Sequence, residues 1–248
     1  MTARDHRWVE SKIAELEKLG QPYVIICGEN LNLRNVVYRK PIGKWDAINY
    51  GHGLVPPHAD VVVLNDVDTR IVGFEEALAC MRATALDLAY CAVKPTMGPQ
   101  REFYAIADPI RKRFHIFASG EVMLVRRRVL DRLMPIPPCV GEDSYLLFKA
   151  LELGYKTGFL RDTYAVTQRT ANAKEEQAYK ERTTLGVLQA LDFSNPPPWI
   201  RLFYWLTPIL ALLLRPVGSA GQSWSKGMLR GFRLHLRGSS RTRFDSAN

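Results

Sequence analysis

Two carboxylates separated by one residue follow an apolar run and are the first candidates for chemistry. The run reads Asp60-Val-Val-Val-Leu-Asn-Asp66-Val-Asp68, and a continuous apolar stretch of this kind is typical of a central strand covered on both faces. In open α/β sheets, ligands bind in the crevice beyond the carboxyl ends of the strands. Paired carboxylates there suit Mg²⁺ or Mn²⁺ bridging a diphosphate, because these cations prefer hard oxygen ligands. A solvated turn at the end of a strand is the alternative interpretation.

One other class of enzymes carries an Asp-x-Asp pair, the haloacid-dehalogenase-like phosphatases. Those enzymes place the pair in the first strand and have Thr or Val four residues after the first Asp. In this chain Arg70 stands at that position, and other predicted strands precede Asp66. The sequence therefore disfavours a phosphatase of that class.

Adjacent acids open a later predicted helix. Gly141-Glu142-Asp143 precedes a helical pattern that ends at Gly154. The free N–H groups and the dipole at a helix N-terminus favour the ionised form of an acid. An ionised carboxylate in a cleft could accept the proton of a hydroxyl nucleophile. Simple helix capping accounts for acids at this position as well.

Two cations could neutralise a phosphate. Lys44 follows Gly43 in a turn of small residues, from which its ammonium could reach a nucleotide phosphate or base. Arg182 lies in Lys180-Glu-Arg182-Thr-Thr-Leu-Gly186 on a late helix, where it could neutralise a leaving diphosphate. A solvated helix face is the alternative interpretation of each.

The predicted elements alternate between strands and helices, which indicates an α/β sandwich with a mainly parallel sheet. The elements follow from hydrophobic periodicity with Gly and Pro at the boundaries. The predicted helices cover 7–19, 43–51, 73–86, 128–134, 141–153 and 175–191, and the predicted strands cover 23–27, 35–38, 60–66, 88–93, 120–125 and 157–160. We expect one domain over residues 1–195.

A Pro-rich break, Asn195-Pro-Pro-Pro198, separates this domain from residues 196–248. The next segment, Leu202–Leu214, carries no charged residue and is flanked by Arg201 and Arg215. It is shorter than the roughly 20 residues that a spanning helix needs, so the sequence predicts an interfacial or re-entrant segment. A C-terminal helix packed on the core is the alternative.

The end of the chain is strongly basic. The 248 residues include 34 Lys and Arg against 25 Asp and Glu, a net charge of +9, and +6 of this lies in residues 215–248. A basic tail predicts a polyanionic partner, and the apolar segment beside it favours an anionic membrane surface. A nucleic-acid-binding protein is the disfavoured alternative, because binding to nucleic acid needs no such apolar segment.

The cysteines and the N-terminus indicate a compartment. Cys27, Cys80, Cys91 and Cys139 stand singly, which disfavours a disulfide scaffold or a thiolate zinc site and suits a reducing environment. The charged N-terminal residues contain no apolar stretch, so no signal peptide is expected. Together with the C-terminal segment, these features predict a protein at the cytoplasmic face of the cell membrane.

The motifs also have an informative order. Gly43-Lys44 precedes Ala47-Ile-Asn49-Tyr-Gly51, and then come a strand ending in Asp66-Val-Asp68, a strand after Ser119-Gly120, and Gly141-Glu142-Asp143 followed by Leu153-Gly-Tyr155. An Arg-containing helix and a membrane-associating C-terminus come last. Over residues 20–190 this order resembles the family 2 glycosyltransferases of the GT-A fold. That group includes polysaccharide synthases, such as cellulose-synthase-like enzymes, and many lipid-linked sugar transferases.

The resemblance implies a donor site for a nucleotide-sugar. By position, Asp68 coordinates Mg²⁺ or Mn²⁺, and Asp66 assists at the metal or at the donor ribose. Lys44 contacts the nucleotide, and Arg182 stands where the family's Q-x-x-R-W arginine binds the diphosphate. In such enzymes the metal and the arginine stabilise the leaving nucleoside diphosphate.

The resemblance also implies an acceptor site and a stereochemical outcome. Asp143 is the general base that deprotonates the acceptor hydroxyl, and Glu142 beside it shapes the site. Gly120 lines the acceptor position. The implied reaction is an inverting transfer of a sugar to a lipid-linked or glycan acceptor at the membrane surface.

The chain departs from the family pattern in two places. The family begins with a strand of the form V-S-V-I-I-P-x-Y-N and has a second strand whose acids hold the base and the ribose. The predicted helix 7–19 and strand 23–27 resemble the elements that follow, so we expect an N-terminally truncated domain without those two strands. The late motif reads Glu181-Arg182-Thr-Thr instead of Q-x-x-R-W. The alternative function is therefore a catalytically weak or inactive glycosyltransferase-like protein that acts as a membrane-bound partner.

Overall fold

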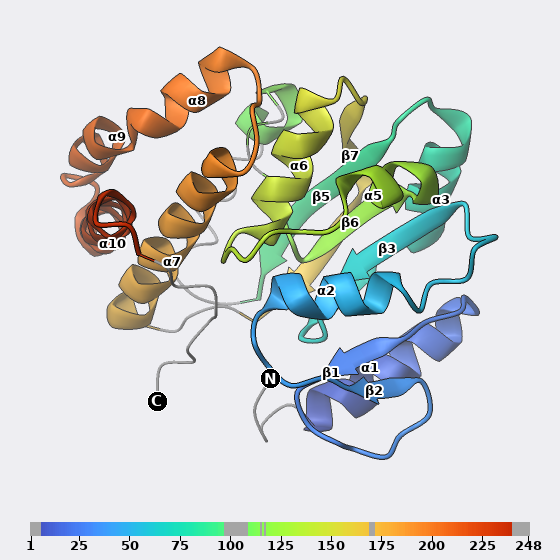
Figure 1. Ribbon diagram of the computed structural model, residues 1–248. Helices are drawn as coiled ribbons and strands as arrows, with labels where there is room; N and C mark the ends of the chain where they lie inside the picture. The colour runs from blue at the N-terminus through green and yellow to red at the C-terminus, as the bar shows by residue number, and fades with distance from the viewer. Residues whose placement is uncertain (1–5, 97–108, 115, 117, 169–171, 240–248) are drawn as a thin grey trace.

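The computed structural model describes residues 6–96, 109–114, 116, 118–168 and 172–239, and these form a sheet with helices on both faces (Figure 1). The helices are α1 (His6–Leu19), α2 (Lys44–His52), α3 (Phe74–Ala83), α5 (Arg127–Leu133), α6 (Glu142–Glu152), α7 (Ala173–Asp192), α8 (Pro198–Trp205), α9 (Thr207–Leu214) and α10 (Gly218–Leu236). The strands are β1 (Ile25–Cys27), β2 (Val36–Tyr38), β3 (Val61–Asn65), β4 (Thr69–Val72), β5 (Leu88–Pro95), β6 (Val122–Arg126) and β7 (Thr157–Thr167).

The described strands form two sheets. The larger sheet has the order β3-β6-β5-β7-β4, and β1 and β2 form a separate parallel pair. The α/β class is confirmed, but the expectation of a mainly parallel sheet is wrong, because β6 runs antiparallel to both β3 and β5 and β4 runs antiparallel to β7. Within the larger sheet, β5 and β7 are the parallel pair. Alternation of strands and helices does not report the direction of a strand that enters the sheet from a loop.

Two details of the sheet were not predicted from the sequence. β4 is a short strand of mixed composition that pairs with the distant end of β7. β7 continues well beyond the predicted 157–160, because a register shift between Cys91 and Ala92 lets Arg161-Asp162-Thr163 bulge out of the ladder. A bulge interrupts the hydrophobic pattern without ending the strand.

The two faces of the sheet carry separate hydrophobic cores. On one face, Tyr90 and Met123 pack with residues of α5, α6 and α7, among them the fully buried Phe148. On the other face, Ala89 and Leu124 pack against α3. β5 is therefore covered on both sides, which explains its continuous apolar sequence. This double burial fixes the centre of the molecule.

The N-terminal helices join the two sheets. Val9 of α1 packs on Ile25 and Cys27 of β1, and Lys12 of the same helix donates to the Asn65 side chain at 2.6 Å and to the Thr69 carbonyl. On α2, the side chain of Asn49 bonds both the N–H and the carbonyl of Ile136 at 2.8 Å. Both helices thus contact the small sheet or its surroundings and the larger body of the protein.

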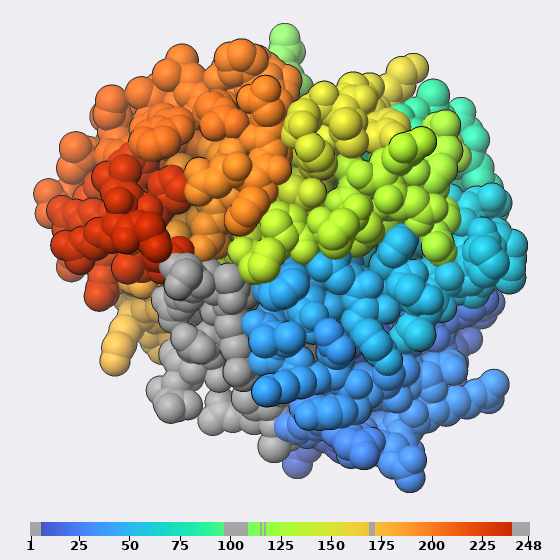
Figure 2. Space-filling model, viewed as in Figure 1, coloured from blue at the N-terminus to red at the C-terminus, as the bar shows by residue number. Residues whose placement is uncertain are grey.

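The C-terminal helices pack beside the sheet as one group, the orange and red surface of Figure 2. α10 lies against α7 at Gly227 and Gly231, where an added Cβ would collide with the backbone carbonyls of Gln177 and Glu181. Trp224 of α10 also donates to Glu176 of α7. Within the part of the chain that the structure describes, no helix combines the length and apolarity needed to cross a bilayer.

Candidate active site

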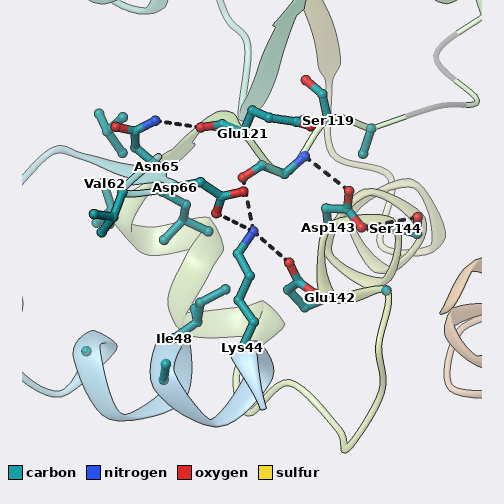
Figure 3. A pocket seen from close by; sticks show the side chains of 18 of the residues that line it. Lys44, Ile48, Val62, Asn65, Asp66, Ser119, Glu121, Glu142, Asp143 and Ser144 are labelled. Atoms are coloured by element: carbon teal, nitrogen blue, oxygen red, sulfur yellow. Dashed lines mark hydrogen bonds and ion pairs between the residues drawn. The ribbon is translucent and has the colours of Figure 1, made fainter. Parts of the chain in front are cut away.

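A lysine at the start of α2 joins residues from three other parts of the chain. Lys44 Nζ lies 2.6 Å from Asp66 Oδ1 and 2.9 Å from Glu142 Oε1, and it donates to the Gly120 carbonyl at 3.2 Å (Figure 3). Asp66 follows β3, Gly120 precedes β6, and Glu142 opens α6. The sequence named all four residues but predicted no contact among them.

The contacts of Lys44 with these carboxylates affect the protonation of Lys44 and of Glu142. Burial opposes the charged form of Lys44, but the attraction of Asp66, Glu142 and Asp143 outweighs it and raises the lysine's pKa above its usual range. Burial also raises the pKa of Glu142 to about 7, since Lys44 only partly offsets the cost of desolvation and Asp143 adds repulsion. Lys44 is therefore a permanent cation at neutral pH, and Glu142 exchanges a proton near pH 7.

The neighbouring acid on α6 faces the cleft. Asp143 Oδ2 accepts the N–H of Gly120 at 3.1 Å, and Oδ1 accepts the N–H of Ser144 at 2.7 Å. A Cβ on Gly120 would lie 3.1 Å from Lys44 Nζ and 3.2 Å from Asp143 Oδ2. A glycine at position 120 thus leaves room for the lysine and the carboxylate to approach the same backbone segment.

The N-terminus of α6 is held against α7 by two glycines. A Cβ on Gly141 would lie 2.5 Å from the backbone of Gly186, and Val140 donates its N–H to Gln189 of α7 at 3.0 Å. Gly186 is four residues, one helical turn, after Arg182. This packing brings the turn of α7 that carries Arg182 toward Glu142 and Asp143.

The second acid of the Asp-x-Asp pair lies further out. Asp68 is exposed in the turn between β3 and β4, where its Oδ1 accepts the Thr69 hydroxyl at 3.4 Å. Asp66 is held deeper, since its N–H donates to the Glu121 carbonyl at 3.2 Å. The turn therefore presents one carboxylate to Lys44 and the other to the solvent side of the cleft.

The carboxylates Asp66 and Asp68 could supply part of the coordination of a divalent cation. Across the described ranges, no three or more His, Cys, Asp or Glu residues gather as a metal site. Mg²⁺ in nucleotide enzymes is usually held by one or two carboxylates, with water and substrate phosphates as the other ligands. Asp66 and Asp68 fit this arrangement, in which the substrate completes the coordination of the metal.

The carboxylates and cations of the candidate site line one large cavity. It encloses about 2550 Å³, and its walls include Lys44, Asp66, Asp68, Asp143 and Arg182. Drug-sized ligands occupy pockets of roughly 300–1,000 Å³, so the cavity has room for two substrates. Arg182 takes its place on the wall from α7, with its guanidinium carbon 5.6 Å from the ring centre of Tyr179.

One cation on the cavity wall was missed by the sequence analysis. Arg111 is buried, donates to the Cys91 carbonyl at 3.2 Å and lines the same cavity. Its sequence signal is weak, because Arg111-Lys-Arg113 falls in a charged, Pro- and Gly-containing stretch that resembles a surface loop. Only the packing against β5 distinguishes it from a solvated arginine.

Comparison with known proteins places the fold. No family model matches the chain, and no curated protein matches its sequence. A solved mannosyltransferase from Pyrobaculum calidifontis, in complex with GDP-mannose and Mn²⁺, is similar with a TM-score of 0.67 at 16% identity, over 96% of this chain and 86% of that one. Glucosyl-3-phosphoglycerate synthase from Mycobacterium tuberculosis, in complex with phosphoglyceric acid, is similar with a TM-score of 0.51 at 15% identity, over 79% of this chain and 78% of that one. The chain therefore has a fold of the GT-A type.

Proposed function

We propose that this protein is a family 2 glycosyltransferase that moves a sugar from a nucleotide-sugar donor to a hydroxyl acceptor with inversion. The observation that carries the proposal is the convergence of Lys44, Asp66, Glu142 and Asp143 in one cavity, from three segments separated in sequence. The similarity of the fold to a mannosyltransferase that binds GDP-mannose and Mn²⁺ supports the same class of chemistry.

On the donor side, Asp66 and Asp68 hold Mg²⁺ or Mn²⁺ together with the phosphates of the donor. The bound metal neutralises charge on the leaving diphosphate. Lys44 orients Asp66 through the 2.6 Å ion pair, and Arg182 and Arg111 supply further positive charge from the cavity wall. Arginine suits this role, because its planar fork pairs with two phosphate oxygens at once.

On the acceptor side, Asp143 takes the proton of the attacking hydroxyl. Its Oδ2 lies at the Gly120 N–H, so the peptide of Gly120 fixes the orientation of the carboxylate. Glu142 is buried against Lys44 and acts as a positioning residue. The separation of roles follows from exposure, since both acids line the cavity and Asp143 is the more exposed of the two.

We further propose that the acceptor is lipid-linked and that α8 and α9 rest on an anionic membrane surface. Leu213 is 67% exposed, Leu202 61% and Ile209 56%, which is unusual for large apolar side chains on two adjacent short helices. The neighbouring α10 adds the basic residues Lys226, Arg230 and Arg233. Apolar insertion and cationic attraction act together on such membranes.

The donor site is tested by nucleotide binding with and without metal. We expect GDP or UDP to raise the melting temperature only when Mn²⁺ or Mg²⁺ is present, since a ligand that binds the native state stabilises it. Asp68→Ala should abolish this shift. Asp60→Asn, at the other end of β3, is the matched control and should keep it. A full shift in Asp68→Ala would refute the assigned metal site.

The membrane surface is tested by sedimentation with vesicles that contain anionic lipid. Replacing Leu202 and Leu213 together by Asp should release the protein, while Leu153→Asp, an exposed leucine on the edge of α6, should not. Binding should weaken at 1 M salt, where the Debye length is about 3 Å. Equal binding of both variants would contradict the membrane proposal.

A second candidate function is favoured by one observation. The sheet is interrupted between the β1–β2 pair and β3, in the half of the molecule assigned here to the nucleotide. A weak or inactive enzyme that serves as a membrane-bound partner would tolerate such a break. Absence of any nucleotide-induced melting shift, with vesicle binding retained, would support this candidate.

A further inference from the structure

The helix α8 has one exposed face and one buried face. Trp199, Leu202 and Trp205 are exposed, whereas Ile200 and Tyr204 are buried. Ile200 and Tyr204 are four residues apart and therefore share one side of the helix. Both belong to the hydrophobic core that is formed with α6, and Tyr204 also lines the cavity. The helix proposed to rest on a membrane thus reaches the candidate active site with its other face.

Tyr204 is held at its ring, its hydroxyl and its backbone. Its ring centre lies 5.6 Å from that of Phe148 of α6 and 5.2 Å from that of Phe203, distances typical of favourable aromatic pairs. Its hydroxyl donates to the carbonyl of Ile116, and its own carbonyl accepts the Thr207 hydroxyl at 2.5 Å. The side chain is therefore fixed by packing and by a hydrogen bond to a segment distant in sequence.

The Ile116 carbonyl is close in sequence to the peptide that contacts the proposed base. Gly120, four residues later, donates its N–H to Asp143 Oδ2 at 3.1 Å. We call Ile116 and residues 118–120 the support segment. Four residues span at most about 14 Å when fully extended. The hydrogen bonds to Tyr204 and to Asp143 therefore lie at the two ends of a short segment.

The support segment is also attached to β5. The Ser119 hydroxyl donates to the Cys91 carbonyl at 2.9 Å, and the buried Arg111 donates to the same carbonyl at 3.2 Å. Cys91 is fully buried and lies where the register of β5 with β7 shifts. The segment is thus positioned from two directions, by β5 at Ser119 and by α8 at Ile116.

The Tyr204 hydroxyl remains protonated over the physiological pH range. Burial raises the pKa of Tyr204 well above its usual range, and the negative charge of Asp143 adds to this rise. Tyr204 is therefore a permanent donor to the Ile116 carbonyl. The effect of the Asp143 charge also indicates that the tyrosine and the proposed base lie near each other, and both line the cavity.

We propose that Tyr204 is a positioning residue for glycosyl transfer and acts through the support segment on the orientation of Asp143. Its hydroxyl holds the Ile116 carbonyl, the segment holds the N–H of Gly120, and this N–H orients the carboxylate toward the acceptor hydroxyl. The inference rests on the proposed role of Asp143 as the base. Because Tyr204 belongs to α8, it connects the helix proposed to rest on the membrane with the residue that takes the proton.

The variant Tyr204→Phe tests this role, because it removes the hydroxyl and keeps the ring that packs on Phe148. The buried Ile116 carbonyl then loses this donor, which favours a shift of the support segment toward another one. Thr163→Val is the matched control. Thr163 is also buried, and its hydroxyl donates to the Gly73 carbonyl at 2.8 Å beside α3. Each variant therefore removes one buried hydroxyl that bonds to a backbone carbonyl.

The orientation of Gly120 has a direct readout. Ser119-Gly120 is the only Ser-Gly pair in the sequence. Protein made by cell-free synthesis with ¹³C at the serine carbonyl and ¹⁵N in glycine therefore gives one correlated NMR signal, that of the Gly120 amide. We expect Tyr204→Phe to move this signal and to speed exchange of this amide with solvent by about tenfold or more, because its bond to Asp143 opens more often. Thr163→Val should leave the signal where it is in the parent.

Steady-state kinetics separate positioning from stability. In Tyr204→Phe, kcat should fall by about 10-fold to 100-fold, because a small misplacement of a reacting group has an effect of this size. The KM for the donor and the metal-dependent melting shift with GDP or UDP should stay as in the parent, since the hydroxyl bonds to the acceptor side. Thr163→Val should change neither kcat nor KM.

Three results would overturn the proposal. The first is a Gly120 signal that Tyr204→Phe leaves unmoved, the second is a moved signal with unchanged kcat, and the third is an equal loss of kcat in Thr163→Val. A parent that transfers no sugar would refute the proposed function and this inference with it. An unmoved Gly120 signal in an active enzyme would refute the inference alone, so the two failures are distinguishable.

Discussion

The two sides of the cavity rest on supports of different completeness. Glu142 and Asp143 stand on α6, whose inner residues, such as Phe148 and Leu147, are fully buried against the sheet. Lys44 opens α2, and Asp66 follows β3, the outer strand of the larger sheet. β5 is buried at nearly every residue, whereas most residues of β3 are only partly buried.

This difference indicates how the site is assembled. The side proposed for the acceptor is fixed by core packing, and the side proposed for the donor is fixed by a few polar contacts. Two of these cross between the sides, the Lys44–Glu142 ion pair and the paired bonds between Asn49 and the backbone of Ile136. Changes on the acceptor side should therefore alter chemistry while the structure persists, and changes on the donor side should alter stability as well.

The largest expected effect lies on the acceptor side. Asp143→Asn keeps the shape of the side chain and removes the proposed base, so kcat should fall by about 10²–10⁴ with little change in the melting temperature. Steady-state kinetics and nucleotide binding on the same preparation separate the two readouts. Loss of nucleotide binding together with turnover would give Asp143 a structural or donor-contact role instead.

Removing the ion pairs of Lys44 with Asp66 and Glu142 should lower the free energy of unfolding. Lys44→Met leaves Asp66 and the buried Glu142 without their cation, and removing one partner of a buried pair costs about 3–5 kcal/mol. Lys44 and Asp66 are each about 30% exposed, so we expect a value at the low end, measured by urea denaturation. The double variant Lys44→Met/Glu142→Gln should recover part of the loss. If the single variant is as stable as the parent, the ion pair does not join the two sides.

Glu142 should make the stability depend on pH. Its pKa is raised by burial to about 7 in the folded protein, against about 4.3 for an unperturbed glutamate. Between these values the folded state binds more protons than the unfolded state, so this contribution to stability is complete below about pH 4 and is lost as pH rises through 7. Glu142→Gln should remove it. The difference in unfolding free energy between parent and variant should therefore change sharply from pH 5 to pH 8, and an equal difference at both would contradict the raised pKa.

The smallest effect should lie on β3, the outer strand of the larger sheet. The bond from the Asp66 N–H to Glu121 and the register with β6 set the alternation of the ladder, so the N–H of Val63 points away from β6. Val63→Pro removes this N–H and should cost the 248-residue chain less than about 1 kcal/mol, since proline is tolerated on edge strands. Val62→Pro removes a ladder bond to β6 and should cost about 3 kcal/mol or more. Equal costs, measured by denaturation, would contradict the assigned direction of the β3 amides.

The sequence by itself determined the local elements. Helical periodicity placed α1, α6 and α7 to within about two residues of their observed ends, a margin normal for helix boundaries. The apolar run before Asp66 identified β3, and the resemblance in motif order indicated the GT-A fold that the structural comparison supports. Such features depend on the types and spacing of residues that are close together in the sequence.

Only the tertiary structure decided how these elements meet. The direction of β6, the strand β4 and the continuation of β7 past its bulge depend on partners far away in sequence. The contact of Lys44 with Glu142 and the position of Arg111 on the cavity wall arise in the same way. A residue's type and its neighbours encode its local conformation, but burial and charge pairing are set by which distant segments pack together, and packing decides which carboxylate is held by a lysine and which faces the cavity.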